Sequence, residues 1–86
     1  MKTTRYFRDV VLNRADRQYL HDLAHRLQEA VDRPLETRLD HRGRTRRFVY
    51  CPEDGHYLRV VVEADGTTIH NAFRDRAYRA HAGGPE

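Results

Sequence analysis

The stretch that decides the fold is Tyr57-Leu58-Arg59-Val60-Val61-Val62-Glu63-Ala64-Asp65-Gly66-Thr67-Thr68-Ile69-His70-Asn71-Ala72-Phe73. Its first part is the most strongly β-forming run in the chain, because valines and an aromatic residue dominate it. The segment Ala64-Asp65-Gly66-Thr67 is typical of a tight hairpin turn. We therefore expect two adjacent antiparallel strands, residues 56–63 and 67–73, with their core side chains at Leu58, Val60, Val62 and Ile69.

The same two-residue period continues upstream of this hairpin. Residues 35–41 alternate as a half-buried strand does, and Arg42-Gly43 marks a turn after them. Residues 45–51 form the next expected strand, and Pro52-Glu53-Asp54-Gly55 is a strong turn signal. Short turns between consecutive strands favour neighbours in one sheet, so the pattern predicts an antiparallel meander.

A helical period precedes the strands. Apolar residues fall on one helical face at Leu20, Leu23, Ala24, Leu27, Ala30 and Val31. They predict a helix over residues 14–32 that begins after an Asn13 cap and ends before Pro34. Residues 3–12 hold aromatic and β-branched side chains, which predict an extended segment or edge strand.

These elements predict an α+β fold, with one main helix packed on a twisted antiparallel β-meander of about four strands. The helix would cover one face of the sheet and leave the other face to solvent or a ligand. The 86 residues suffice for a single domain with a thin core. We place this domain at residues 1–80 and a flexible C-terminal tail at residues 81–86.

The composition is basic, with 16 Lys and Arg against 13 Asp and Glu. Nearly all of the cations are arginines, whose planar donor fork suits phosphate and carboxylate groups. The single cysteine, Cys51, excludes an internal disulfide and favours a reducing compartment. No apolar run is long enough to cross a membrane, and no signal peptide is visible, so we expect a cytoplasmic protein.

Arginines cluster at the first hairpin, at Arg42, Arg44, Arg46 and Arg47. Strand alternation places Arg44 and Arg46 on the face of Phe48 and Tyr50, and Arg47 on the opposite face. Arginines beside aromatic rings on an open sheet suit single-stranded RNA, because guanidinium groups bind phosphates and rings stack on bases. The alternative is an arginine-rich hairpin that is merely solvated.

Arg59 interrupts the apolar strand, on the face of Tyr57 and Val61. An arginine in such a place indicates either a buried ion pair, for which Glu63 is the expected partner, or an anionic ligand.

The end of the last strand holds the residues best suited to chemistry. His70, with Arg74 and Arg76 close behind it, is a set that can cleave RNA through attack by the RNA's own 2′-hydroxyl, without a metal. The alternatives are a hydrogen-bonded strand histidine and a local salt bridge from Asp75 to Arg74 or Arg76. His21 and His25 lie one helical turn apart but lack a third ligand, so we expect no metal site there.

Three segments resemble the RelE/ParE-type toxin superfamily of small bacterial proteins: Gly43-Arg44-Thr45-Arg46, Tyr57-Leu58-Arg59-Val60-Val61-Val62, and Asp65-Gly66-Thr67-Thr68-Ile69-His70-Asn71-Ala72-Phe73 with Asp75-Arg76. The resemblance extends over residues 5–78. It implies a ribonuclease-like fold of helices on a twisted antiparallel sheet. It also implies that Arg44, Arg46 and Arg59 line an RNA-facing sheet, that His70 is the acid–base group, and that Arg74, Arg76 and Tyr78 lie near the scissile phosphate.

Two functional hypotheses follow, beside a third in which the chain is a plain structural or regulatory domain whose basic face has no special role. The first is a metal-independent, cofactor-free endoribonuclease toxin, neutralised by a small antitoxin protein that covers its basic face. Its expected catalytic residues are His70, Arg59 and Arg76, and its expected RNA-binding residues are Arg44, Arg46, Arg47, Arg74 and Tyr78. The second is a non-catalytic module of the same fold that binds nucleic acid or protein. Neither involves a membrane, and either is compatible with a homodimer.

Overall fold

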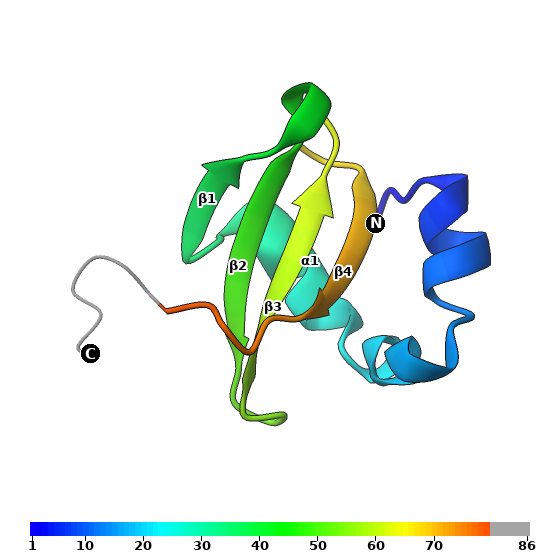
Figure 1. Cartoon of the computed structure of the whole chain (residues 1–86), viewed down its shortest axis with the longest axis vertical. Helices are drawn as coiled ribbons and strands as arrows, with labels where there is room; N and C mark the ends of the chain where they lie inside the picture. Colours follow the sequence, from blue (N-terminus) through cyan, green and yellow to red (C-terminus); the bar gives the residue numbers. More distant parts are fainter. Residues whose placement is uncertain (80–86) are drawn as a thin grey trace.

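The structure is a computed structural model that describes residues 1–79, so the expected tail at 81–86 lies outside the described residues. Four strands form one antiparallel sheet in the order β1-β2-β3-β4 (Figure 1). They are β1 Glu36–Leu39, β2 Thr45–Cys51, β3 His56–Val62 and β4 Ile69–Arg74. The predicted α+β architecture with a β-meander is therefore confirmed.

Helical segments precede the sheet: η1 Phe7–Val11, η2 Ala15–Asp22 and α1 Ala24–Asp32. Helix α1 packs behind β2 and β3, whereas η1 and η2 lie beside β4 (Figure 1). A short turn, η3 His41–Gly43, joins β1 to β2.

The expected strand at residues 3–12 was wrong, because most of this segment is helical. Phe7 and Val11 are both buried, and their four-residue spacing suits one helical face. Within it, Thr3 forms an isolated parallel bridge with Ile69. Thr4 N donates to the carbonyl of Ile69, and Ile69 N donates to the carbonyl of Lys2, each at 2.9 Å. This pairing covers part of the outer edge of β4.

The predicted helix over residues 14–32 is divided at Leu23, whose backbone angles of φ −117° and ψ 25° are not helical. The part before the break, η2, is a tighter 3₁₀-helix, and its Leu20 and the break residue Leu23 are three positions apart and both buried. Asn13 does not cap this helix. Its side chain donates instead to the carbonyl of Asp9, and Arg14 occupies the cap position.

The core lies between the helices and the inner face of the sheet. From the helical side it includes Phe7, Val11, Leu20, Leu23, Leu27 and Ala30. From the sheet it includes Val49, Cys51, Leu58, Val60, Val62, Ile69 and Ala72. The four core residues expected from the sequence hairpin are all fully buried there.

The outer face of the sheet is partly covered by the chain itself. After β4 the chain turns back at Asp75, whose amide donates to the carbonyl of Tyr57. Tyr78 and Asp75 are both buried against this face, with exposed fractions of 4% and 8%. The outer face is therefore neither bare nor fully closed.

Candidate functional site

The outer face is built from cross-strand rows of side chains. One row joins Arg46, Val61 and Asn71, and the next joins Phe48, Arg59 and Phe73. Arg59 thus lies on this face, as its position in the strand predicted.

Aromatic rings and guanidinium groups fill the centre of the outer face. The rings of Phe48 and Tyr78 stack with their centroids 4.0 Å apart and 8° between their planes. The guanidinium carbon of Arg38 lies 5.3 Å from the Phe48 centroid and 5.1 Å from that of Tyr78. Arg59 lies 5.0 Å from the Phe73 centroid in the same way. These cation–π contacts tie the arginines to the surface of the sheet.

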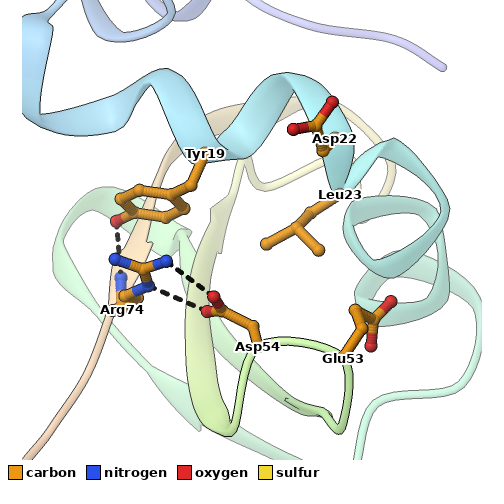
Figure 2. Close-up of a pocket in the computed structure, with 6 residues that line it drawn as sticks. All are labelled: Tyr19, Asp22, Leu23, Glu53, Asp54 and Arg74. Carbon is orange, nitrogen blue, oxygen red and sulfur yellow. Dashed lines mark hydrogen bonds and ion pairs between the residues drawn. The ribbon is translucent and has the colours of Figure 1, made fainter.

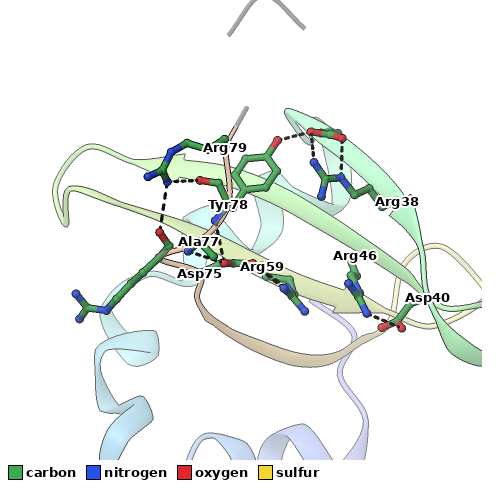
Figure 3. A network of polar contacts seen from close by, with 10 residues as sticks. Arg38, Asp40, Arg46, Arg59, Asp75, Ala77, Tyr78 and Arg79 are labelled. Atoms are coloured by element: carbon green, nitrogen blue, oxygen red, sulfur yellow. Dashed lines mark hydrogen bonds and ion pairs between the residues drawn. The ribbon is translucent and has the colours of Figure 1, made fainter. Parts of the chain in front are cut away.

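Asp75 holds this layer together (Figure 3). Its Oδ2 accepts from Nε and Nη2 of Arg59 at 3.0 and 2.8 Å. Its Oδ1 accepts from the backbone amides of Ala77 and Tyr78 at 3.1 and 3.0 Å. Asp75 therefore neutralises Arg59 and also fixes the segment that places Tyr78 over Phe48.

The Tyr78 hydroxyl donates to the Glu36 carboxylate on β1. Burial is the main cause that raises the pKa of the Tyr78 phenol, and the hydrogen bond to Glu36 raises it further. Tyr78 is thus a neutral bridge between the C-terminal segment and the first strand.

His70 lies where β4 has a bulge, between the pairs Val61–Asn71 and Val62–Ile69. The extra residue lets Ile69 and Ala72, three positions apart, both face the core. The His70 ring stacks on Tyr6, with 5.0 Å between centroids. The bulge thus interrupts the strict alternation that the sequence predicted, and sets His70 against the N-terminal segment.

The contacts of His70 leave one ring nitrogen free. Its Nδ1 lies 3.3 Å from the Thr4 hydroxyl and 3.3 Å from Oε2 of Glu63. The other oxygen of Glu63 accepts from Nε of Arg44 at 3.0 Å. Among residues 1–79, Nε2 of His70 has no hydrogen-bond partner. Nδ1 therefore faces Thr4 and Glu63, and Nε2 is the ring nitrogen without such a contact in the described part of the chain.

The three expected catalytic residues do not meet at one point. His70 pairs beside Val61, whereas Arg76 follows Asp75, which hydrogen-bonds to Tyr57. Four residues along a strand separate these two ends by about 13 Å. Arg59 lies between them and is engaged by Asp75, rather than by the expected partner Glu63. Glu63 follows the end of β3, four residues from Arg59, and pairs instead with Arg44 and His70.

Of the expected RNA-binding arginines, two point toward the outer face. Arg44 is engaged by Glu63, and Nη2 of Arg46 lies 3.4 Å from Asp40. Nε of Arg46 is buried and, among residues 1–79, has no hydrogen-bond partner. The guanidinium of Arg46 therefore has an N–H group that donates to none of the described residues, in the cross-strand row that Arg46 shares with Val61 and Asn71.

Arg47 and Arg74 lie on the helical side of the sheet. Arg47 donates from Nη1 to the carbonyl of Val31 at 2.9 Å. Arg74 donates to both oxygens of Asp54 at 2.8 and 2.6 Å, and its guanidinium lies 3.9 Å from the Tyr19 ring centroid. Both side chains connect the sheet to the helical layer, away from His70.

Arg74 borders a hollow of about 320 Å³ between η2 and the β2–β3 turn (Figure 2). The hollow is lined by Tyr19, Asp22, Leu23, Glu53, Asp54 and Arg74. The Arg74 guanidinium holds the pKa of Asp54 below its usual value, and Arg26 does the same for Glu53. These carboxylates are engaged by cations of the chain itself.

The two helical histidines and the cysteine are engaged or buried. Nε2 of His21 contacts the carbonyl of Leu12, and His25 contacts Glu53. Within residues 1–79 no three His, Cys, Asp or Glu side chains converge as a metal site would require. Cys51 is fully buried, and this burial raises the pKa of its thiol to about 11.

Thr4, Tyr6 and Glu63 are the residues around His70 that the sequence did not identify as a site. Alternation along one strand gives no information about a bulge or about contact with the chain's first residues. The histidine-bearing arrangement, defined as Thr4, Tyr6, Arg44, Glu63 and His70, is called the histidine site below.

The chain matches no protein-family model, and no curated protein or solved structure shows significant similarity to it. None of the helices in residues 1–79 is long and apolar enough to cross a membrane.

Proposed function

We propose that the protein is a metal-independent endoribonuclease of the cytoplasm, the toxin of a toxin–antitoxin pair. The observation that carries the proposal is the histidine site. Nδ1 of His70 contacts the Thr4 hydroxyl and the carboxylate of Glu63, which Arg44 fixes in turn, and Nε2 has no hydrogen-bond partner among residues 1–79. A histidine oriented by a second group is the arrangement that general acid–base chemistry uses.

In the proposed reaction, Nε2 of His70 takes the proton of a ribose 2′-hydroxyl. The 2′-oxygen attacks the adjacent phosphorus, and the bond from phosphorus to the 5′-oxygen breaks. The products are a 2′,3′-cyclic phosphate and a 5′-hydroxyl, whose oxygen takes a proton from the imidazolium. Arg44 and Arg46, at the same end of the sheet, supply positive charge for the phosphorane.

The test is incubation of the purified protein with RNA in excess EDTA. We expect cleavage with cyclic phosphate ends, detected by mass spectrometry. His70→Ala should lower the rate by about 10²–10⁴-fold, the usual contribution of a general acid–base group.

His41→Ala is the matched control, because the His41 side chain is 88% exposed and lies outside the histidine site. It should cleave at the wild-type rate. Loss of cleavage in EDTA, or equal rates for His70→Ala and His41→Ala, would contradict the proposal.

A second candidate is a non-catalytic module that binds nucleic acid or protein. It is favoured by the ion pairs of the outer face, where Asp75 neutralises Arg59 and Asp40 contacts Arg46. Salt-sensitive RNA binding without cleavage would support this second function.

A partner antitoxin belongs to the first proposal. It would cover the outer face and so block access of RNA to His70. We expect an adjacent gene that encodes a small acidic protein, and co-expression with its product should restore growth to cells that the protein alone arrests.

A further inference from the structure

A second hollow lies on the outer face, at the end of the sheet remote from His70. It has a volume of about 290 Å³ and is lined by Tyr50, Gly55, His56, Tyr57, Asp75, Arg76, Tyr78 and Arg79. We call it the tyrosine hollow. Its lining differs from that of the histidine site, because it includes three tyrosine rings and two arginines.

The three rings form a connected wall. Tyr78 meets Tyr57 edge to face at 71°, and Tyr57 meets Tyr50 at 61°, with 5.0 Å between the centroids in each pair. Tyr78 is buried, whereas Tyr50 is 45% exposed. Tyr50 therefore offers a ring that is held on one side by its neighbour and is open to a ligand on the other.

The charge around this hollow is not neutralised as it is elsewhere on the face. Nη1 of Arg79 donates to the backbone carbonyls of Arg76 and Tyr78 at 3.4 and 3.1 Å, and to no carboxylate of residues 1–79. The Arg76 guanidinium has no partner in the part of the chain that the structure describes. The carboxylate that lines the hollow, Asp75, is engaged by Arg59. Two cations therefore remain available beside the rings.

We propose that the tyrosine hollow binds one unstacked nucleotide of single-stranded RNA. Its base would stack on Tyr50, and Arg76 and Arg79 would contact the adjoining phosphate. Rings that stack on bases beside arginines that bind the backbone are how single strands are recognised. An acidic peptide would use the arginines but would gain little from the rings.

The inference rests on the proposed function in one respect, because the nucleotide belongs to the RNA that His70 cleaves. The two sites lie about 13 Å apart along the strands, so the bound nucleotide is separate from the scissile linkage. Arg76 is thereby assigned to substrate binding rather than to the chemical step.

The test measures binding without cleavage. A fluorescein-labelled 2′-O-methyl tetrauridylate cannot cyclise, so its fluorescence polarisation reports affinity whether or not the protein is a nuclease. We expect Tyr50→Ala to weaken binding at least about five-fold, and Tyr50→Phe to preserve it. Arg76→Ala should also reduce the magnitude of the salt slope of log K by about 0.7.

Arg33→Ala is the matched charge control, because Arg33 follows α1 and has no side-chain partner within residues 1–79. It should leave the affinity close to wild type. Equal affinities for wild type and Tyr50→Ala, equal effects of Arg76→Ala and Arg33→Ala, or complete displacement by polyglutamate at equal charge would overturn the inference. Failure of RNA cleavage with a normal Tyr50 effect would refute only the nuclease.

Discussion

Replacing Asp75 tests whether this carboxylate fastens the C-terminal segment to the sheet. Asp75→Ala removes the acceptor of four hydrogen bonds, two donated by Arg59 and two by the backbone amides of Ala77 and Tyr78. Breaking a fully buried ion pair costs about 3–5 kcal/mol. The Arg59 side chain is 26% exposed, so water can partly rehydrate it. We therefore expect the free energy of unfolding to fall by about 2–3 kcal/mol.

Asp75→Asn separates the two roles. The amide oxygen of the asparagine can still accept hydrogen bonds from the backbone amides of Ala77 and Tyr78. The asparagine is neutral, however, so it lacks the negative charge that attracts Arg59. We expect a loss of about 1–2 kcal/mol, smaller than that of Asp75→Ala. At about 4–8 °C per kcal/mol for a domain of this size, the alanine variant should melt about 8–24 °C below wild type.

Urea unfolding followed by circular dichroism and by tyrosine fluorescence measures both variants, because the chain has five tyrosines and no tryptophan. Asp22→Ala is the control, since Asp22 is an exposed carboxylate with no ion pair among residues 1–79. It should change stability by no more than about 0.5 kcal/mol. The reasoning fails if Asp75→Ala behaves like Asp22→Ala, or if a double-mutant cycle with Arg59→Ala shows no coupling.

Three further predictions concern the turns, the carboxylates and the thiol. Gly43→Ala should lower the free energy of unfolding in urea by about 1–2 kcal/mol, more than Gly55→Ala does. Both glycines have positive φ, but a Cβ at Gly43 would lie 3.3 Å from a side-chain carbon, whereas a Cβ at Gly55 would meet nothing within 4 Å. Arg26 lowers the pKa of Glu53 from 4.5 to about 2. The contribution of this carboxylate to stability should therefore be complete above pH 4.5 and be lost as the pH falls to 2. An acid titration of the free energy of unfolding measures this, and a flat profile would contradict it. Burial raises the pKa of Cys51 from 9.0 to about 11, so stability should fall as the pH rises through this range, and Ellman's reagent should label the native thiol only as fast as the fold opens.

The sheet was predictable because its signals are local. The strand predicted at residues 45–51 has the same bounds as β2, because turn residues flank it and its side chains alternate. The N-terminal segment was not predictable in this way. Its aromatic and β-branched residues favour a strand by propensity, but burial of Phe7 and Val11 on one face makes it helical.

The candidate site was predictable only in part. The face of Arg59 followed from strand alternation, but its partner Asp75 becomes a neighbour only after the chain reverses beyond β4. The environment of His70 depends on a bulge and on residues near the start of the chain. A two-residue period contains no information about either.

The contact between Thr4 and His70 joins residues 66 positions apart. During synthesis on the ribosome, the first residues must therefore wait until nearly the whole domain has emerged before they can meet β4. Closing so long a loop is entropically unfavourable until the intervening strands have paired. A nascent or truncated chain that ends before β4 lacks His70 itself, so the proposed activity would arise only after the last strand is made and has met the N-terminal segment.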